Sequence, residues 1–167
     1  HFFKEKINSD KKIFAKKIFT KKLSPEIINS ICKFKDTFWK FGIKSQLEYF
    51  HKFINPDDKH FLIYNFDTII GYGLIRQVDN YFIIDNILVQ ENYRNKGFGK
   101  QIIETLIKDI KEPIYLLCEN QNIKFYEKLD FKINIKVELL DKDIKKLTLM
   151  SYNSNSNKLK IKYYNNQ

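Results

Sequence analysis

The chain has 167 residues, of which 43% are hydrophobic and 16% aromatic, so it is long and apolar enough to fold around a core, which excludes a disordered segment. Its formal net charge of +10 at pH 7 raises the question of nucleic-acid binding, but the lysines are scattered and form no basic stripe. The residues in excess (Lys, Asn, Ile, Phe and Tyr) are those that A- and T-rich codons encode, so we interpret the charge as a solvated basic surface with no specific nucleic-acid partner.

Two helices are predicted after a first strand over residues 13–19. Ser24-Pro25-Glu26 is a typical helix start, because serine caps the first turn, proline suits its first position and an acid follows. Apolar residues then recur at helical spacing as far as Phe38. A second helix is expected over residues 45–54, and Asn55-Pro56 ends it.

Three strands and a third helix come next. The strands are expected over residues 60–65, 68–78 and 81–89, with connections so short that they predict antiparallel hairpins. The helix begins at Gly97, and we expect its apolar residues to be buried. These residues are Ile102, Ile103, Leu106, Ile107 and Ile110.

The last part of the chain is predicted to hold a strand, a short helix and two further strands. Their ranges are 114–118, 123–129, 131–139 and 145–152. We expect a single domain over residues 1–152. The tail over 153–167 is polar, and its period-two pattern at 158–164 fits either an extra edge strand or disorder.

The cysteine count and the apolar runs predict the compartment. Cys32 and Cys118 are too few for a disulfide scaffold and are expected to be buried thiols in a reducing compartment. No apolar run approaches a membrane span, and the first residues contain no signal-peptide pattern. We therefore expect a cytoplasmic protein without a membrane partner, and the absence of Cys/His groups at metal spacing predicts no metal.

The segment Arg94-Asn95-Lys96-Gly97-Phe98-Gly99 carries the most functional information. It joins a predicted strand to a predicted helix, so several backbone N–H groups are left unpaired at the positive end of a helix dipole. Such a turn binds phosphate, and glycine lets the backbone approach the ligand. The chain has only five glycines and two arginines, and this segment holds two of those glycines and one of those arginines. The sequence therefore predicts a phosphate site here.

Two motifs resemble the GNAT superfamily of N-acetyltransferases. Residues 89–99, Val-Gln-Glu-Asn-Tyr-Arg-Asn-Lys-Gly-Phe-Gly, are similar to the family's acetyl-CoA signature, Arg/Gln-x-x-Gly-x-Gly/Ala after a strand. Residues 122–131 are similar to its FYEKLGF segment, with Asp130 where glycine is usual. An aspartate can adopt the left-handed conformation that a helix end often needs. The order of predicted elements over residues 12–152 also matches the family.

This resemblance implies a fold and a cofactor site. The implied fold is the GNAT fold of the α/β (α+β) class, a central mixed, mostly antiparallel sheet of about seven strands flanked by about four helices. Acetyl-CoA would be the acetyl donor, with its pyrophosphate on the backbone amides of the turn, its pantetheine arm along the preceding strand end, and its thioester near Asn122 and Tyr126. The residues so assigned are Leu88, Val89, Arg94, Asn95, Lys96, Gly97, Phe98, Gly99, Lys100, Asn122 and Tyr126.

The resemblance also suggests catalytic roles. Direct attack of an amine on a thioester requires a neutral amine and a proton for the departing thiolate. Tyr126 is the candidate proton donor; its alternative role is that of an ordinary core aromatic. Asp85 lies inside an apolar strand and is the candidate base, acting through water, or else a carboxylate satisfied by a neighbouring hydroxyl or backbone group. Cys118 has no evident histidine partner, so a thiol nucleophile is not expected.

The function that follows is acetyl transfer from acetyl-CoA to a small primary amine. Residues 118–126 resemble amino-sugar acetyltransferases, which favours an amino sugar, while a polyamine, an amino acid and an aminoglycoside stay open. The alternatives are a protein or peptide N-acetyltransferase, or a catalytically idle module of this fold that binds CoA or a partner. A homodimer is expected only by analogy with the family.

The acceptor would contact the first two helices and the loop between the last two strands. Those segments contain aromatic residues that could wall a pocket and acids that could hold a cationic amine. The residues are Trp39, Phe41, Tyr49, Phe50, Asp57, Asp58, Asp141 and Asp143. His51 and His60 are expected at the surface or in loops.

Overall fold

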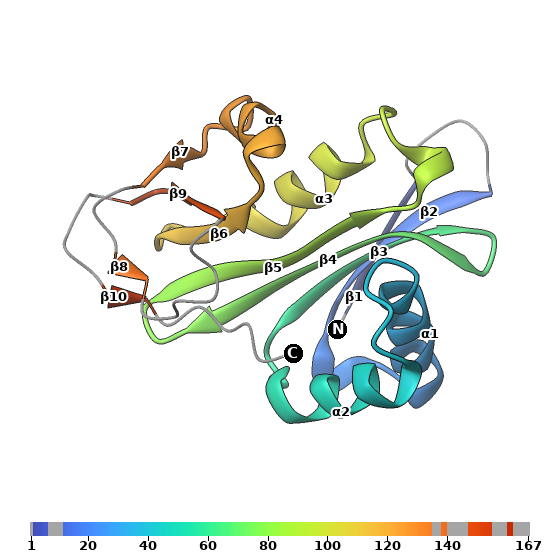
Figure 1. Cartoon of the computed structure of the whole chain (residues 1–167). Coiled ribbons are helices and arrows are strands. Elements are labelled where there is room, and N and C mark those ends of the chain that lie inside the picture. Colours follow the sequence, from blue (N-terminus) through green and yellow to red (C-terminus); the bar gives the residue numbers. More distant parts are fainter. Residues whose placement is uncertain (1, 7–11, 135–137, 140–146, 155–159, 162–167) are drawn as a thin grey trace. The chain divides into compact units, whose positions relative to one another are not determined.

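The structure, a computed structural model, describes residues 2–6, 12–134, 138–139, 147–154 and 160–161 (Figure 1). The chain forms two compact units. The first unit comprises His1–Arg76 and Asn86–Lys108, and the second unit comprises Gln77–Asp85 and Asp109–Gln167.

Four strands that lie in the first unit, except for the last two residues of the fourth, pair in chain order. They are β1 (Phe2–Lys6), β2 (Ile13–Phe19), β3 (Lys59–Asn65) and β4 (Thr68–Val78), and each is antiparallel to the next. The β3–β4 ladder shifts register between Ile63 and Tyr64. The hairpin expected between these two strands is therefore confirmed, and β1 is an additional strand that the sequence pattern did not indicate.

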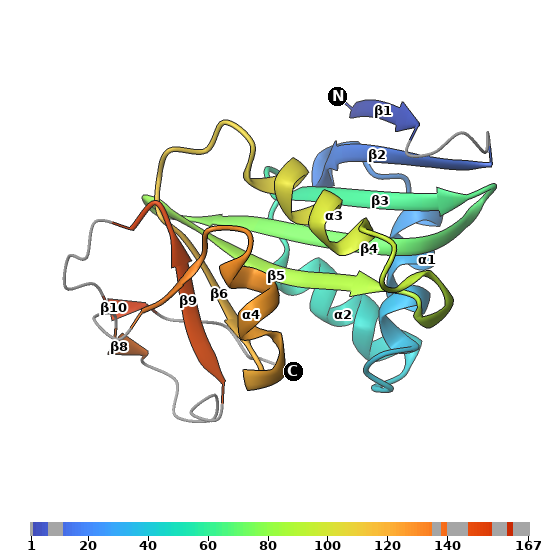
Figure 2. The ribbon, with the colours of Figure 1, turned by 90° about the horizontal axis from the view of Figure 1, so that it is seen from above.

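Helices cover both faces of these strands. Figure 1 shows α1 (Pro25–Asp36) and α2 (Ile43–Phe53) on one face and α3 (Phe98–Ile107) on the other, and Figure 2 shows α3 lying over the strands. The predicted cap of α1 is confirmed, because Ser24 Oγ accepts a hydrogen bond from the Ile27 N–H at 3.2 Å.

The main core of the first unit lies between α1, α2 and the strands. Its buried members are Ile18, Leu23, Ile31, Cys32, Phe34, Phe50, Ile54, Leu62, Tyr64, Ile69, Tyr72, Leu74 and Leu88. On the opposite face α3 packs so closely on β4 that a Cβ at Gly73 would overlap Ile102 Cγ2. The last residues of β5 and the first turns of α3 are thus fixed by the packing of one unit.

The second unit contains the remaining strands. The start of β5 (Tyr81–Val89) is parallel to β6 (Ile114–Cys118), β6 is antiparallel to β9 (Thr148–Tyr152), and β9 is antiparallel to β7 (Lys132–Ile133). The short helix α4 (Ile123–Glu127) precedes β7. A separate parallel pair joins β8 (Glu138–Leu139) to β10 (Lys160–Ile161).

The predicted fold class is confirmed: the strands form a mixed, mostly antiparallel arrangement with four α-helices among the described residues. Two boundaries differ from the prediction. Helix α3 ends at Ile107, because Lys108 leaves helical geometry (φ −55°, ψ 132°), so Ile110 lies outside it. Within the strand predicted over 131–139, the described residues form the two short strands β7 and β8.

Candidate functional site

The turn between β5 and α3 has the geometry that the glycine motif predicts. A single 3-10 turn, Glu91–Tyr93, follows β5, and α3 begins at Phe98 with Gly97 as its capping residue. Gly97 is in the left-handed region (φ 88°, ψ 3°), and so is Asn95 (φ 62°). Two left-handed residues within three positions change the direction of the chain sharply between the end of β5 and the start of α3.

Backbone N–H groups at this turn are available to an anion. The first N–H groups of an α-helix have no acceptor one turn earlier, and in α3 these belong to Phe98, Gly99 and Lys100. Gly97 has no side chain that could cap them. Phe98 is buried and anchors the helix, whereas residues 94–97 are exposed. The positive end of the α3 dipole therefore faces solvent across an exposed turn, as an anion site requires.

Charged side chains of the turn add to this field. Arg94, Lys96 and Lys100 are all exposed. The Arg94 Nε–H donates to the Val89 carbonyl oxygen at 3.1 Å, which ties the head of the turn to the end of β5. Just beyond Val89, the Gln90 N–H donates to the Ile70 carbonyl oxygen at 2.8 Å. Three cationic side chains and the backbone N–H groups at the start of α3 thus lie within one short segment.

The side chain of Leu88 lies in the core of the first unit, and Val89 is half-buried. All residues that the sequence assigns to the pyrophosphate and to the strand end, from Leu88 to Lys100, belong to this unit.

In the second unit, Tyr126 lies on α4 among aromatic rings. Its ring centroid is 5.1 Å from that of Phe125 and 6.0 Å from that of Phe131. Burial, and then the nearby Cys118, raise the pKa of the Tyr126 phenol to about 12. The phenol therefore keeps its proton at neutral and moderately alkaline pH, as a proton donor must.

The end of α4 confirms one detail predicted from the motif. Asp130 has φ 68°, in the left-handed region. The chain reverses there, and the Phe131 N–H donates to the Tyr126 carbonyl oxygen at 3.1 Å. Aspartate thus performs the backbone role expected of glycine, and Tyr126 is held by a closed helix end.

Cys118 is a buried thiol at the end of β6. Its Sγ donates to Met150 Sδ on β9 at 3.6 Å. Burial, and then Glu119, raise the pKa of this thiol to about 11. A thiol that is protonated at neutral pH is a poor nucleophile, which agrees with the expectation that Cys118 is not catalytic.

Two further predicted site residues belong to the second unit. Asn122 is exposed and precedes α4, and Asp85 is half-buried on β5 between more deeply buried neighbours. The described part of the chain contains no group of three or more His, Cys, Asp or Glu side chains that could hold a metal ion. No helix among the described residues is long and apolar enough to cross a membrane.

The structure corrects the expectations for two polar residues of the first unit. His60 is not a surface residue; it is fully buried on β3, and the signal for this was its place at the head of an apolar strand pattern. Asp58 is also buried, and it accepts a hydrogen bond from Arg76 Nε at 3.2 Å. Asp58 is therefore committed to an internal ion pair and not to an amine substrate.

The aromatic residues of the first two helices divide into two groups. Tyr49 and Phe50 are buried, whereas Trp39 and Phe41 are 40% and 53% exposed on the connection between α1 and α2. Two hydrogen bonds tie this connection to the helices: Gln46 Nε2 donates to the Trp39 carbonyl oxygen, and the Gly42 N–H donates to Asp36 Oδ1, both at 2.8 Å. Asp141 and Asp143 lie outside the described residues.

Comparison with known proteins finds sequence similarity to acetyltransferases. The model of the acetyltransferase (GNAT) family matches residues 27–131. Glucosamine 6-phosphate N-acetyltransferase 1 of Dictyostelium discoideum is 35% identical over 109 residues, which cover 56% of this chain and 69% of that protein.

Solved structures share the fold at low sequence identity. ElaA of Escherichia coli superposes with a TM-score of 0.65 at 19% identity, over 83% of this chain and 98% of that one. An aminoglycoside 6'-N-acetyltransferase complexed with coenzyme A gives a TM-score of 0.66 at 15% identity, over 81% and 95% of the two chains.

Proposed function

This chain belongs to the acetyltransferase (GNAT) family, and on that premise we propose that it transfers an acetyl group from acetyl-CoA directly to the primary amine of a small molecule. The observation that carries the proposal is the exposed turn at the start of α3. Its uncapped helix N-terminus, its two left-handed residues and its three cationic side chains form an anion site of the kind that a pyrophosphate occupies.

Acetyl-CoA fits the donor groups of the first unit. The backbone N–H groups from Arg94 to Lys100 would hold the pyrophosphate, and the side chains of Arg94, Lys96 and Lys100 would add positive charge. Backbone groups of Leu88 and Val89 would pair with the pantetheine arm. When bound, acetyl-CoA supplies the activated acetyl thioester; the protein supplies binding, orientation and proton transfer.

Two side chains of the second unit are proposed for proton transfer. Tyr126 would protonate the departing sulfur, and its raised pKa supports this because the phenol retains its proton under assay conditions. Asp85 would accept the amine proton through water, so that the amine is neutral when it attacks. Asn122 is proposed to lie near the thioester, as the FYEKLGF-like motif implies.

We propose an amino sugar as the acceptor. This choice rests on the segment at residues 118–126 and on the 35% identity to a protein named as a glucosamine 6-phosphate N-acetyltransferase. The exposed rings of Trp39 and Phe41 are candidates for the acceptor contact, because aromatic faces pack well on sugar rings. The two buried thiols favour a reducing compartment, and we therefore propose a cytoplasmic location.

Thermal unfolding with and without millimolar acetyl-CoA tests the cofactor site. A ligand present at about 100 times its Kd stabilises the native state by about 2.7 kcal/mol, which raises the midpoint by several degrees. Thiol release is then measured over amino sugars, including glucosamine 6-phosphate, and over polyamines, aminoglycosides, amino acids and peptides, with products identified by mass. No shift in the midpoint and no turnover with any amine would reject the proposal, whereas a shift without turnover would support the idle CoA-binding module.

A further inference from the structure

The turn that begins α3 is attached to the end of β3 by a partly buried side-chain hydrogen bond. Asn65, the last residue of β3, donates through Nδ2 to the hydroxyl oxygen of Tyr93 at 2.6 Å, across 28 residues of sequence. Tyr93 is the residue immediately before Arg94. The bond therefore joins the sheet to the position where the proposed pyrophosphate-binding amides start.

The Tyr93 side chain also reaches the far side of the turn. Its ring centroid is 6.2 Å from that of Phe98, the buried first residue of α3, and the Lys96 ammonium lies 6.0 Å from the Tyr93 ring. The ring thus contacts residues within and beyond the turn, and its hydroxyl is held by Asn65. Residues 94–97 are exposed and contain two left-handed positions, so their conformation depends on such restraints.

The Asn65 end of this contact is firmly placed. Asn65 pairs with Thr68 on β4 and with Ile13 on β2. The next residue, Phe66, has φ 54°, and its N–H donates to the Lys12 carbonyl oxygen at 2.7 Å. Because Asn65 lies on β3 between its two partner strands, its backbone is fixed, and its side chain is a rigid support for the turn.

The other polar atom of the same amide has no hydrogen-bond partner among the described residues. Asn65 Oδ1 is buried and unpartnered. A buried acceptor without a hydrogen bond destabilises the folded state, and an apolar side chain of the same shape would avoid this cost. The amide is thus poorly suited to packing alone, and the bond to Tyr93 gives it a specific role.

We propose that Asn65 and Tyr93 are positioning residues that hold the turn over residues 94–100 in the conformation that binds the CoA pyrophosphate. Neither acts on the reacting atoms. This inference rests on the proposed function, because the anion site is the same one. It adds that the affinity for acetyl-CoA is set in part by the β3–β4 hairpin, through a contact outside the glycine motif.

Two variants remove the bond from either side. Tyr93→Phe deletes only the hydroxyl, and Asn65→Leu replaces the amide with an apolar group of similar size. One hydrogen bond contributes about 0.5–1.5 kcal/mol, so each variant is expected to raise the Kd for acetyl-CoA by about 2- to 13-fold, with kcat at saturating acetyl-CoA within about 2-fold of the parent. The double variant is expected to bind no more weakly than the weaker single variant, since both remove the same bond.

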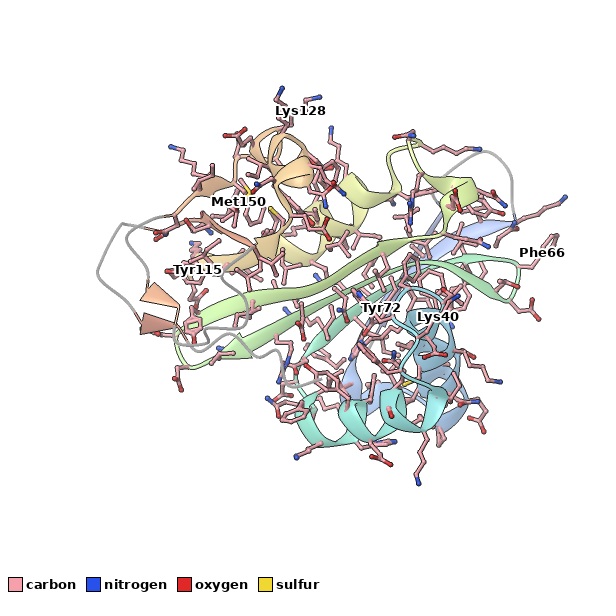
Figure 3. All side chains as sticks on the ribbon, viewed as in Figure 1. Lys40, Phe66, Tyr72, Tyr115, Lys128 and Met150 are labelled. Carbon is pink, nitrogen blue, oxygen red and sulfur yellow. The ribbon has the colours of Figure 1, made fainter. Side chains whose placement is uncertain are left out.

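Phe66→Ala is the matched control. Phe66 adjoins Asn65 at the tip of the same hairpin, is 62% exposed and points away from the strands (Figure 3). This variant should bind acetyl-CoA like the parent. Binding by calorimetry, kcat, and hydrogen exchange of the residue 95–100 amides in the ligand-free protein are measured for all four variants.

The readouts separate this inference from the proposed function. Faster exchange of the residue 95–100 amides in Tyr93→Phe and Asn65→Leu, with a weaker Kd, supports it. Unchanged exchange and Kd would overturn it, and so would an equal loss of affinity in Phe66→Ala. If the parent itself binds no acetyl-CoA, the proposed function fails, while hydrogen exchange in the ligand-free protein still decides whether Asn65 and Tyr93 hold the turn.

Discussion

His60 Nδ1 lies 2.6 Å from the hydroxyl oxygen of Tyr72, and both side chains are fully buried in the first unit. The other ring nitrogen, Nε2, lies 2.7 Å from Thr20 Oγ1, and the imidazole stacks on Phe50 with 5.6 Å between the ring centroids. Burial, reinforced by the positive charge of Lys35, lowers the pKa of His60 to about 3. The histidine is therefore neutral in the folded protein at physiological pH.

Acid should destabilise the protein through this residue. The unfolded chain has an ordinary histidine pKa of about 6.5, so between pH 6.5 and pH 3 the unfolded state binds the extra proton and the folded state does not. The contribution of His60 to the free energy of unfolding is therefore fully present above pH 6.5. It is lost as the pH falls below 6.5, by about 1.4 kcal/mol per pH unit at most. Urea unfolding of the parent and of His60→Gln at pH 7.5, above this window, and at pH 5.5 and 4.5, within it, measures the effect.

His60→Gln should show a shallower fall of the unfolding free energy between pH 6.5 and 4.5 than the parent. Equal slopes for the parent and His60→Gln would contradict the assignment of this proton to His60.

The ion pair between Arg76 and Asp58 should contribute far more to the free energy of unfolding than its N–O distance of 3.2 Å suggests. Its side chains are only 7% and 2% exposed, and Arg76 also donates to the Phe53 carbonyl oxygen. Arg76→Met should lower the unfolding free energy by about 3–5 kcal/mol, because it leaves the Asp58 carboxylate buried without its cation. Lys21→Met breaks a shorter pair, 2.7 Å from Asp57, whose side chains are 51% and 74% exposed.

That exposed pair should contribute less than about 1 kcal/mol, since solvent screens it. Denaturant titration of both variants at one pH tests the contrast. If Lys21→Met lowered the free energy of unfolding as much as Arg76→Met, burial would not explain how much these two ion pairs contribute to stability.

Substitution of Gly97 should separate backbone strain from crowding. No heavy atom lies within 4 Å of a Cβ placed there, so the φ of 88° is the obstacle. Gly97→Ala should destabilise the turn by about 1–2 kcal/mol and weaken acetyl-CoA binding by about tenfold. Gly97→Asn should retain more affinity, because asparagine tolerates the left-handed region. Calorimetric titration with acetyl-CoA ranks the three proteins, and equal affinity for all of them would argue against a conformational requirement.

Removal of the Tyr126 hydroxyl should slow turnover and leave cofactor binding intact. General acid catalysis contributes typically about 10²–10⁴-fold, so Tyr126→Phe should lower kcat by about that factor with the Kd for acetyl-CoA within about 2-fold of the parent. Since the pKa of this phenol is about 12, the parent's rate should show no fall from Tyr126 ionisation up to about pH 11. A kcat for Tyr126→Phe equal to that of the parent would remove the phenol from the mechanism.

Sequence reasoning succeeded where the signals are local. The turn over Arg94–Gly99 combines a strand, glycines and an apolar helical pattern within a short stretch, and each signal acts over a few residues. The left-handed Asp130 was predictable for the same reason, because a helix end there demands that conformation. Such features need no knowledge of distant partners.

Two of the expectations that were wrong, those for His60 and Asp58, concern residues whose environment is set by distant segments. His60 lies 40 residues from Thr20 and 12 from Tyr72 along the chain, and no local pattern indicates that these side chains meet. Asp58 is committed to Arg76, which is 18 residues away on another element. The end of α3 was placed too late because Ile110 continues the helical spacing, although Asp109 has already adopted φ 64°.

The way the two units alternate along the chain determines when each of them can fold during synthesis. Residues 86–108, which complete the first unit with the turn and α3, are made only after residues 77–85 of the second unit. A growing chain on the ribosome therefore cannot finish the first unit until Lys108 has left the exit tunnel. β6, the strand that pairs with the start of β5, is synthesised later still. Folding during translation should accordingly proceed with the proposed phosphate-binding turn assembled before the β5–β6 pair, and no single cleavage of the chain separates the two units from each other.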